Sequence, residues 1–378
     1  MHKLLPFSYA LALALVPAVS YAAAPTLNDV LGASGISVSG FVDSSFSYLS
    51  GSGLFQGGVA DRVFDYQHDS FNLNNVDLKV QSTATSGAGG VVEVNAGQDA
   101  NVFQSYPYAG TTHKFDVQQA YLQYIAGPVT FMAGKFDTLA GAEVIDSSGD
   151  VNFSRSILFG YAIPFTHTGV RATYALNSST SFTVGVNNGW DQVVAETSPK
   201  TLELGVSATP VKPLTLTASY YTGQEYVGEP AALGSFGTSA TGNRKLLDVV
   251  ATYTIISPLS VTLNYDTATQ DNYDGAGDKA KWSGLAAYVT YQFAPTWRLD
   301  VRGEYFKDPQ GYRTGVDVGT GGQKWKEGTV TVAYLPNASM ELRGEVREDK
   351  SNVAAFGTTS GGFKDTQHSV ALEALYKF

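Results

Sequence analysis

The sequence predicts an all-β fold, a transmembrane antiparallel β-barrel of about sixteen strands, and three observations indicate it. Apolar and polar residues alternate at period two along most of the chain, as in strands with one face in lipid and the other in water. Short turns alternate with long polar loops, and the last strand alternates down to a terminal Phe378. The strand count depends on where the turns are placed, so fourteen and eighteen strands stay open.

The composition separates this chain from ordinary soluble proteins. Charged residues make up 15% of its 378 residues, against about 25% in average globular proteins, while aromatic residues reach 12%. Cysteine is absent, which excludes disulfides and thiolate–metal chemistry. The net charge of −10 argues against nucleic acid as a partner. No motif indicates a cofactor, a metal or a catalytic centre, so an enzyme is the least favoured class.

The N-terminus has the pattern of a cleaved secretory signal, which we expect to cover residues 1–22. A positive charge precedes an apolar run that is too short to span a bilayer, and Ser20 and Ala22 place small residues where signal peptidase reads. The alternative is a buried N-terminal helix. We expect a periplasmic segment at 23–35 and an outer-membrane barrel at 36–378, which makes the outer membrane the expected location.

Strand alternation is clearest between Trp297 and Tyr305, where each even position is charged and each odd position is apolar, aromatic or Gly. Period-two alternation recurs at 340–347 with a charge at every second position, and at 168–176, 202–209 and 285–293 without a charge at every polar position. A charge facing lipid near the midplane costs about 2–4 kcal/mol, so charged positions should face the lumen. The expected lumen charges are Lys135 (on a weakly alternating strand), Arg298, Arg302, Glu304, Arg343 and Arg347, beside Glu93 and further carboxylates. They would serve selectivity, or equally stiffen the wall as cross-strand ion pairs.

Two kinds of connection alternate between these strands. The short turns are expected at 83–90, 126–128, 177–180, 210–213, 257–258, 294–295 and 336–337. The long polar loops are expected at 49–70, 99–115, 137–165, 188–200, 222–245, 267–282, 307–327 and 349–365. This rhythm is typical of short periplasmic turns and long external loops, and it places both chain ends on the periplasmic side. A soluble sandwich or propeller is the structural alternative, but aromatic residues near the strand ends favour a membrane girdle.

The last strand is the most specific segment. Apolar residues occupy every second position from Val370 to Tyr376 and Phe378, and the matching first strand is expected at Ile36–Tyr48. A terminal Phe with an aromatic residue two positions before it resembles the signal read by the bacterial barrel-assembly machinery. Tyr376 and Phe378 are therefore the expected assembly signal.

Several motifs between Phe71 and Asp191 resemble one known family. They are Phe71-Asn72-Leu73-Asn74-Asn75, Gln118-Gln119-Ala120-Tyr121-Leu122, Ala133-Gly134-Lys135-Phe136, Gly141-Ala142-Glu143-Val144-Ile145, Asn152-Phe153-Ser154-Arg155-Ser156, Pro164 to Arg171 and Val186 to Asp191. Together they resemble the OmpL-like putative β-barrel porin family, also called putative β-barrel porin-2, over roughly a third of the chain. The resemblance implies a pore more firmly than any particular solute.

The loop from Asp137 to Phe165 is the expected functional element, because it is too apolar for a solvated surface loop. It would be the third external loop, which in general porins folds into the lumen. We expect it to pack against the inner wall and set the electric field of the pore. The candidate constriction residues are Glu143, Asp146, Asp150, Arg155, His167 and Arg171. An external lid or a trimer contact is the alternative for this loop, and His167 is equally consistent with a turn residue.

The predicted function is passive diffusion of small hydrophilic solutes or ions through a water-filled lumen. The rival is a non-conducting barrel that acts as a receptor, adhesin or structural protein. Some bulky residues alternate inward and would narrow the bore: Phe41, Tyr221, Tyr288, Phe306 and Leu375. The expected partners are outer-membrane lipids and lipopolysaccharide, the assembly machinery and the solutes. A homotrimer is compatible with this size, although no segment indicates the contact face.

Overall fold

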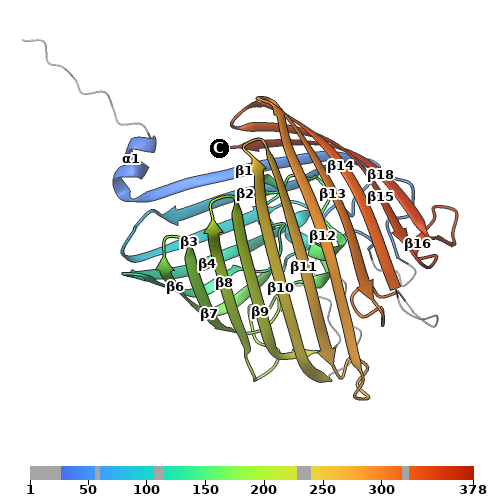
Figure 1. Cartoon of the computed structure of the whole chain (residues 1–378), viewed down its shortest axis with the longest axis horizontal. Coiled ribbons are helices and arrows are strands. Elements are labelled where there is room, and N and C mark those ends of the chain that lie inside the picture. Colours follow the sequence, from blue (N-terminus) through green and yellow to red (C-terminus); the bar gives the residue numbers. More distant parts are fainter. Residues whose placement is uncertain (1–26, 56–59, 106–113, 228–239, 317–322) are drawn as a thin grey trace, which may run out of the picture.

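Sixteen strands close into one antiparallel barrel in the computed structural model, which describes residues 27–55, 60–105, 114–227, 240–316 and 323–378. Each strand pairs with its neighbours in sequence, and β1 closes the ring against β18 (Figure 1). The barrel strands are β1 Ile36–Leu49, β2 Ser70–Ser82, β3 Gly87–Ala96, β4 Phe115–Ala126, β5 Val129–Asp137, β6 Thr166–Asn177, β7 Thr180–Asn187, β8 Thr201–Val211, β9 Leu214–Tyr226, β10 Thr241–Ile256, β11 Leu259–Asp271, β12 Lys279–Ala294, β13 Trp297–Asp308, β14 Gln323–Asn337, β15 Met340–Ser351 and β18 Thr366–Lys377. The predicted fold class and strand number are confirmed.

The seam between the first and last strands is made as the terminal alternation predicts. Val42 is paired with Tyr376, and the backbone N–H groups of Gly40 and Phe378 each donate to the other's carbonyl at 3.0 Å. Gly40 is required here, because a Cβ atom at this position would lie 2.3 Å from the Asp77 carbonyl oxygen and 2.8 Å from the Phe378 ring. A closed seam leaves no edge, which is the condition for a sheet in lipid.

The two faces of the wall differ as strand alternation predicts. On β13 the side chains of Asp300, Arg302 and Glu304 are buried inside the barrel, while Val301 and Gly303 are exposed outside. The same pattern holds on β15, where Glu341, Arg343, Glu345 and Arg347 are buried. The charged residues therefore line the lumen and the apolar ones face lipid.

The strands on one side extend further beyond the membrane than the sequence predicts. β11 ends at Asp271 and β12 begins at Lys279. The loop between them is therefore 272–278, shorter than the expected loop at 267–282. Backbone pairing persists there although the side chains are polar, because extracellular strand ends are in water and need no apolar face. The loop before β18 carries its own hairpin, β16 Phe356–Gly357 with β17 Phe363–Lys364.

The expected signal and periplasmic segments at the N-terminus stay predictions. The signal segment 1–22 lies outside the described residues. A short helix, α1 Leu27–Ser34, occupies most of the expected periplasmic segment, and it lies outside the barrel wall (Figure 1). In the described part of the chain, no helix has both the length and the apolar character needed to cross a bilayer.

An apolar core lies inside the barrel, toward the end with the long loops. It joins side chains from the loops with inward-facing aromatic residues of the wall, and the inward positions of Tyr221, Tyr288 and Phe306 agree with the sequence. Its largest fully buried members are Trp282, Trp325, Tyr161, Tyr221, Phe55, Phe103, Phe306, Phe356, Leu158 and Ile163. The lumen is therefore filled with protein at this level, so any water-filled path there must be narrow.

Candidate constriction site

The third long loop crosses the lumen. It leaves β5 at Asp137, contains the short helices η2 Ser147–Gly149 and α2 Ile157–Ala162, and joins β6 at Thr166. Many of its partners are on β12 to β15, which occupy the opposite side of the closed strand order from β5 and β6, and others are on β9 and β11. The expectation that this loop folds into the barrel is confirmed, and we call residues 138–165 the crossing loop.

Two wall carboxylates hold the crossing loop by its backbone. Glu304 accepts hydrogen bonds from the Ile157 and Leu158 N–H groups at 2.6 and 2.9 Å. Glu345 accepts the N–H groups of the residues at 153 and 154 at 2.8 and 3.1 Å. The first pair satisfies donors of the first turn of α2 that have no partner within the helix. These contacts fix the loop against β13 and β15.

Wall arginines hold the loop's carbonyl groups in the same way. Arg302 donates to the Ser154 carbonyl at 2.5 Å and to Glu143 at 2.7 Å. Arg343 donates to the Asp150 carbonyl at 2.5 Å, and Arg347 to the Arg155 carbonyl at 2.6 Å. Charge-assisted bonds of this kind are roughly twice as strong as neutral ones. The expected lumen charges on these strands thus lie in the lumen, where they are occupied with the loop.

The predicted constriction residues Asp150 and Arg155 bind inside the loop itself, and Glu143 binds both the loop and the wall residue Arg302. Glu143 accepts from the Ser156 N–H and hydroxyl, and Asp150 lies 3.0 Å from the Arg155 guanidinium. Arg155 is only 4% exposed and also donates to the Ile145 carbonyl. Burial raises the pKa of Asp150 to about 7, although the neighbouring Arg155 opposes the shift. These three side chains fix the loop's shape.

His167 and Arg171 lie at the foot of the crossing loop on β6. Arg171 makes a two-point ion pair with Glu203 at 2.5 and 2.9 Å and stands 4.0 Å over the Phe136 ring. His167 is fully buried and stacked on Tyr221. The structure does not bring Arg171 to the loop carboxylates, because Glu203 already occupies its guanidinium.

Lys135 differs from the other expected lumen charges. Lys135 lies between Gly134 and Phe136 on β5. The Phe136 ring packs in the lumen beneath the Arg171 guanidinium. Alternation therefore gives Lys135 the opposite face of β5. Its ammonium donates to Asp116 at 2.8 Å and to the Val117 carbonyl at 2.7 Å. The register thus does not support a lumen position for Lys135.

Asp146 meets a group of wall residues that the sequence did not single out as a site. Ligand oxygens of Asp146, Asp77 on β2 and Glu93 on β3 all lie within 4.8 Å of one another. Lys79 lies 3.0 Å from Glu93 Oε2. Burial, followed by the charge of Glu93, raises the pKa of Asp146 to about 6. The alternation of Asp77 with Lys79 on the expected second strand was the available signal, but nothing in one sequence places it beside the crossing loop.

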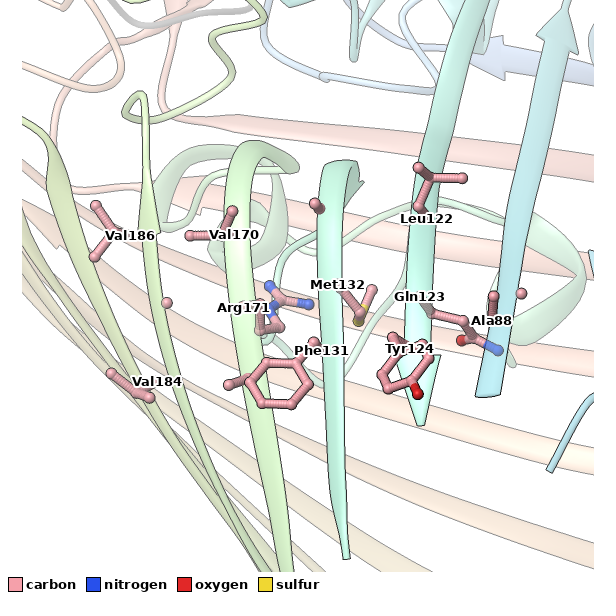
Figure 2. A pocket seen from close by; sticks show the side chains of 14 residues that line it. Ala88, Leu122, Gln123, Tyr124, Phe131, Met132, Val170, Arg171, Val184 and Val186 are labelled. Atoms are coloured by element: carbon pink, nitrogen blue, oxygen red, sulfur yellow. The ribbon is translucent and has the colours of Figure 1, made fainter. Parts of the chain in front are cut away.

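A separate hollow lies on the outer surface of the wall, between β3 and β7 (Figure 2). Its volume is about 650 Å³, and it is lined mainly by apolar residues, among them Leu122, Phe131, Val170 and Val186. These side chains face away from the lumen, so the hollow is not part of the pore. It breaks the smooth lipid-facing surface of the barrel.

Comparison with known proteins identifies relatives of this architecture. Residues 35–378 match the family described as putative beta-barrel porin-2, OmpL-like, which is far more of the chain than the motifs between Phe71 and Asp191 cover. The solved structure of the outer membrane channel DcaP of Acinetobacter baumannii is similar, at 17% identity and a TM-score of 0.60, covering 91% of this chain and 97% of that one.

Two further porin structures are similar over the same span. The anion-selective porin of Comamonas acidovorans has 11% identity and a TM-score of 0.60, and the trimer form of OmpT of Vibrio cholerae has 14% and 0.59. Each likeness covers 91% of this chain and 99% of the other. At such identities these structures support the fold alone. No curated protein matches the chain.

Proposed function

Because the chain belongs to the OmpL-like putative beta-barrel porin-2 family and is thus an outer-membrane channel for diffusion, we propose a specific route through it. Small hydrophilic solutes and ions pass along the edge of the crossing loop that carries Val144 and Asp146, beside the point where Asp146 approaches β2 and β3. On the opposite side the loop is bound to the wall by Glu304, Glu345 and the arginines, which leaves no room for a solute.

The observation that carries this proposal is the difference between the two sides of the crossing loop. Asp146 is only partly buried, Val144 is 46% exposed, and the Lys79 side chain is 25% exposed. Toward the end with the short turns, the inner wall carries hydroxyl pairs such as Thr173 with Thr183, 2.9 Å apart. A polar wall and a partly solvated loop edge are what a path for hydrated solutes requires.

Among the predicted constriction residues, we assign Asp146 to the border of this route. Glu143, Asp150 and Arg155 support the loop from within, and Arg171 and His167 support its foot. The net charge near Asp146 is negative, which favours cations over anions along this path. A channel of this kind needs no chemistry on the solute, so an enzyme remains the less supported reading.

Single-channel recording in planar bilayers tests the proposal. The full-length protein should give small, stepwise conductances with a reversal potential that favours K⁺ over Cl⁻ in a salt gradient. Asp146→Asn should reduce this preference, whereas Asp274→Asn, in the exposed loop 272–278, should leave it unchanged. A folded barrel with no conductance at any voltage would instead favour the non-conducting receptor or structural barrel, which the apolar core inside the lumen makes the second candidate.

We further propose that the chain forms a homotrimer through the wall between β3 and β7. The hollow on this wall and its apolar rim offer a surface for a second copy, and OmpT of Vibrio cholerae has been solved in a trimer form. Val170→Arg, at a position 57% exposed on that wall, should shift the mass measured by light scattering in detergent from trimer to monomer. A wild-type monomer would contradict the assembly.

A further inference from the structure

The carboxylates between the crossing loop and the wall have more oxygens than hydrogen-bond donors. Asp77 is 3% exposed and Glu93 0% exposed, yet Asp77 Oδ2, Glu93 Oε1 and Asp146 Oδ1 are buried without a hydrogen-bond partner. A buried polar atom without a partner costs about 1–3 kcal/mol, and more when it is charged. Ligand oxygens of these three carboxylates lie within 4.8 Å of one another, so unpartnered oxygens on each of them call for a positive group close by.

A neutral oxygen completes the set. Asn95 is directly paired with Asp77 across β2 and β3, and its Nδ2 group donates to Gln118 while its Oδ1 has no partner. Residues directly opposite on neighbouring strands have Cβ atoms about 5 Å apart. Asn95 Oδ1 is therefore a fourth oxygen near the group, held by a hydrogen bond that turns its donor end away.

The charge of this group suits a divalent cation. Three carboxylates and the Lys79 ammonium, which lies 3.0 Å from Glu93 Oε2, leave a charge of −2 when all are ionised. Mg²⁺ and Ca²⁺ prefer carboxylate and carbonyl oxygens, and both leave positions for water. Lys79 alone does not balance this negative charge. Its ammonium contacts Glu93 Oε2, whereas the oxygen without a hydrogen-bond partner is Glu93 Oε1.

We propose that Asp77, Glu93 and Asp146, with Asn95 as a neutral ligand, bind one divalent cation of the Mg²⁺ or Ca²⁺ type. The cation joins the crossing loop to the β2–β3 wall. It binds at the border of the proposed solute route, so its effect on transport rests on that proposed function, whereas its binding does not. With the cation bound, the loop edge is held against the wall and the local negative charge is neutralised.

Calcium binding is measured on the full-length protein, refolded in detergent without lipopolysaccharide and freed of metal with EDTA. Isothermal titration with Ca²⁺ or Mg²⁺ should reveal one saturable site. Asp146→Asn and Asp77→Asn should each weaken binding about tenfold or more, as expected for loss of a ligand. Asp274→Asn is the matched control, because its carboxylate lies in an exposed loop where it accepts the Ala276 and Asp278 N–H groups.

A Lys79→Met variant tests which positive group balances the three carboxylates. The candidates are a bound divalent cation, a proton and the Lys79 ammonium. Removing the ammonium makes the group more negative, so Ca²⁺ should bind more tightly. Unchanged or weaker affinity would overturn the site, as would no saturable heat in the wild type. Heat-modifiable mobility on gels confirms that each variant is folded, and Asp146→Asn, which lies in a loop, tests the site even if a wall variant does not fold.

Binding and conductance are scored separately. A channel that conducts but binds no cation at this group overturns the cation site and leaves the proposed function standing. A barrel that binds Ca²⁺, loses this binding in the Asp77 and Asp146 variants and never conducts supports the cation site and overturns the proposed function. When both hold, adding Ca²⁺ should lower the K⁺ preference of the wild type but not that of Asp146→Asn.

Discussion

At the scale of single residues, the lumen is organised by side chains that hold the backbone of the crossing loop. Arg302, Arg343 and Arg347 donate to loop carbonyls and to neighbouring carboxylates. Breaking such a buried pair leaves an uncompensated charge and is strongly destabilising. Substitutions of these arginines should thus change the loop before they change selectivity.

Glu304 gives the sharpest test of this anchoring. Glu304→Ala leaves the Ile157 and Leu158 N–H groups without an acceptor, at about 1–3 kcal/mol each. Hydrogen exchange of peptides from the crossing loop should accelerate by about tenfold or more, since 1.4 kcal/mol is a factor of ten. Glu304→Gln keeps one acceptor and should have a smaller effect. The control is Glu348→Ala, whose side chain is exposed; equal exchange in both alanine variants would refute the anchor.

We expect Asp146 to make the loop's contact with the wall dependent on pH. Its pKa of about 6 is above the ordinary value of 3.8, so the docked state takes up a proton that the undocked state does not. Docking without metal is therefore weakest above pH 6 and strengthens as the pH falls toward 4. The charged groups around Asp146 are Asp77 and Lys79 on β2, Glu93 on β3 and Asp137 on β5.

The measurement is current noise of single channels in EDTA at pH 7.5 and pH 5. Noise from loop movement should decrease at pH 5 in the wild type, and this decrease should be smaller in Asp146→Asn. Other acidic groups of the loop, such as Asp150, titrate in the same range, so the comparison between the two proteins carries the conclusion. An identical pH response in both would assign the effect to groups other than Asp146.

At the scale of elements, the strands were predictable from sequence because their physics is local. Period-two alternation and turn residues predict each strand, and the first strand begins at Ile36 as expected. The crossing loop was recognisable by its apolar content. Its partners were not, because the contact between Glu304 and Ile157 joins residues 147 positions apart and leaves no local pattern. Asp77 was missed for the same reason.

The seam shows what a small residue contributes to an element. Gly40→Ala should strain β1 against both of its neighbours, because the added Cβ would lie 2.3 Å from the Asp77 carbonyl oxygen on β2 and 2.8 Å from the Phe378 ring after β18; overpacking of this kind costs about 1–3 kcal/mol. Gly328→Ala on β14 is the control, since no atom lies within 4 Å of its added Cβ. The yield of heat-modifiable barrel after refolding should fall for the first variant only. Equal yields would mean that β2 and the Phe378 ring can shift to relieve these contacts.

At the scale of the whole molecule, the barrel and its contents have separate roles. Sixteen strands enclose enough space for an aqueous channel. The long loops fill that space toward their end with apolar side chains, including Phe55 from the first loop and Phe356 from the last. We therefore expect the loops to set the permeability, while the wall sets only an upper limit.

Removal of the crossing loop measures how far the loop lowers the conductance below the limit set by the barrel wall. Replacing residues 142–162 by a short Gly-Ser linker removes α2 and its contacts with β11, β12 and β13, while every barrel strand keeps its partners. Single-channel conductance should rise severalfold, since a barrel of this size without an inward loop leaves a wide aqueous bore. Deleting the exposed hairpin tip 358–362 is the control and should leave conductance unchanged. If the loop deletion folds and conducts no better than wild type, the remaining core around Trp325 and Phe356 limits the current instead, and the solute route would have to be placed away from the crossing loop.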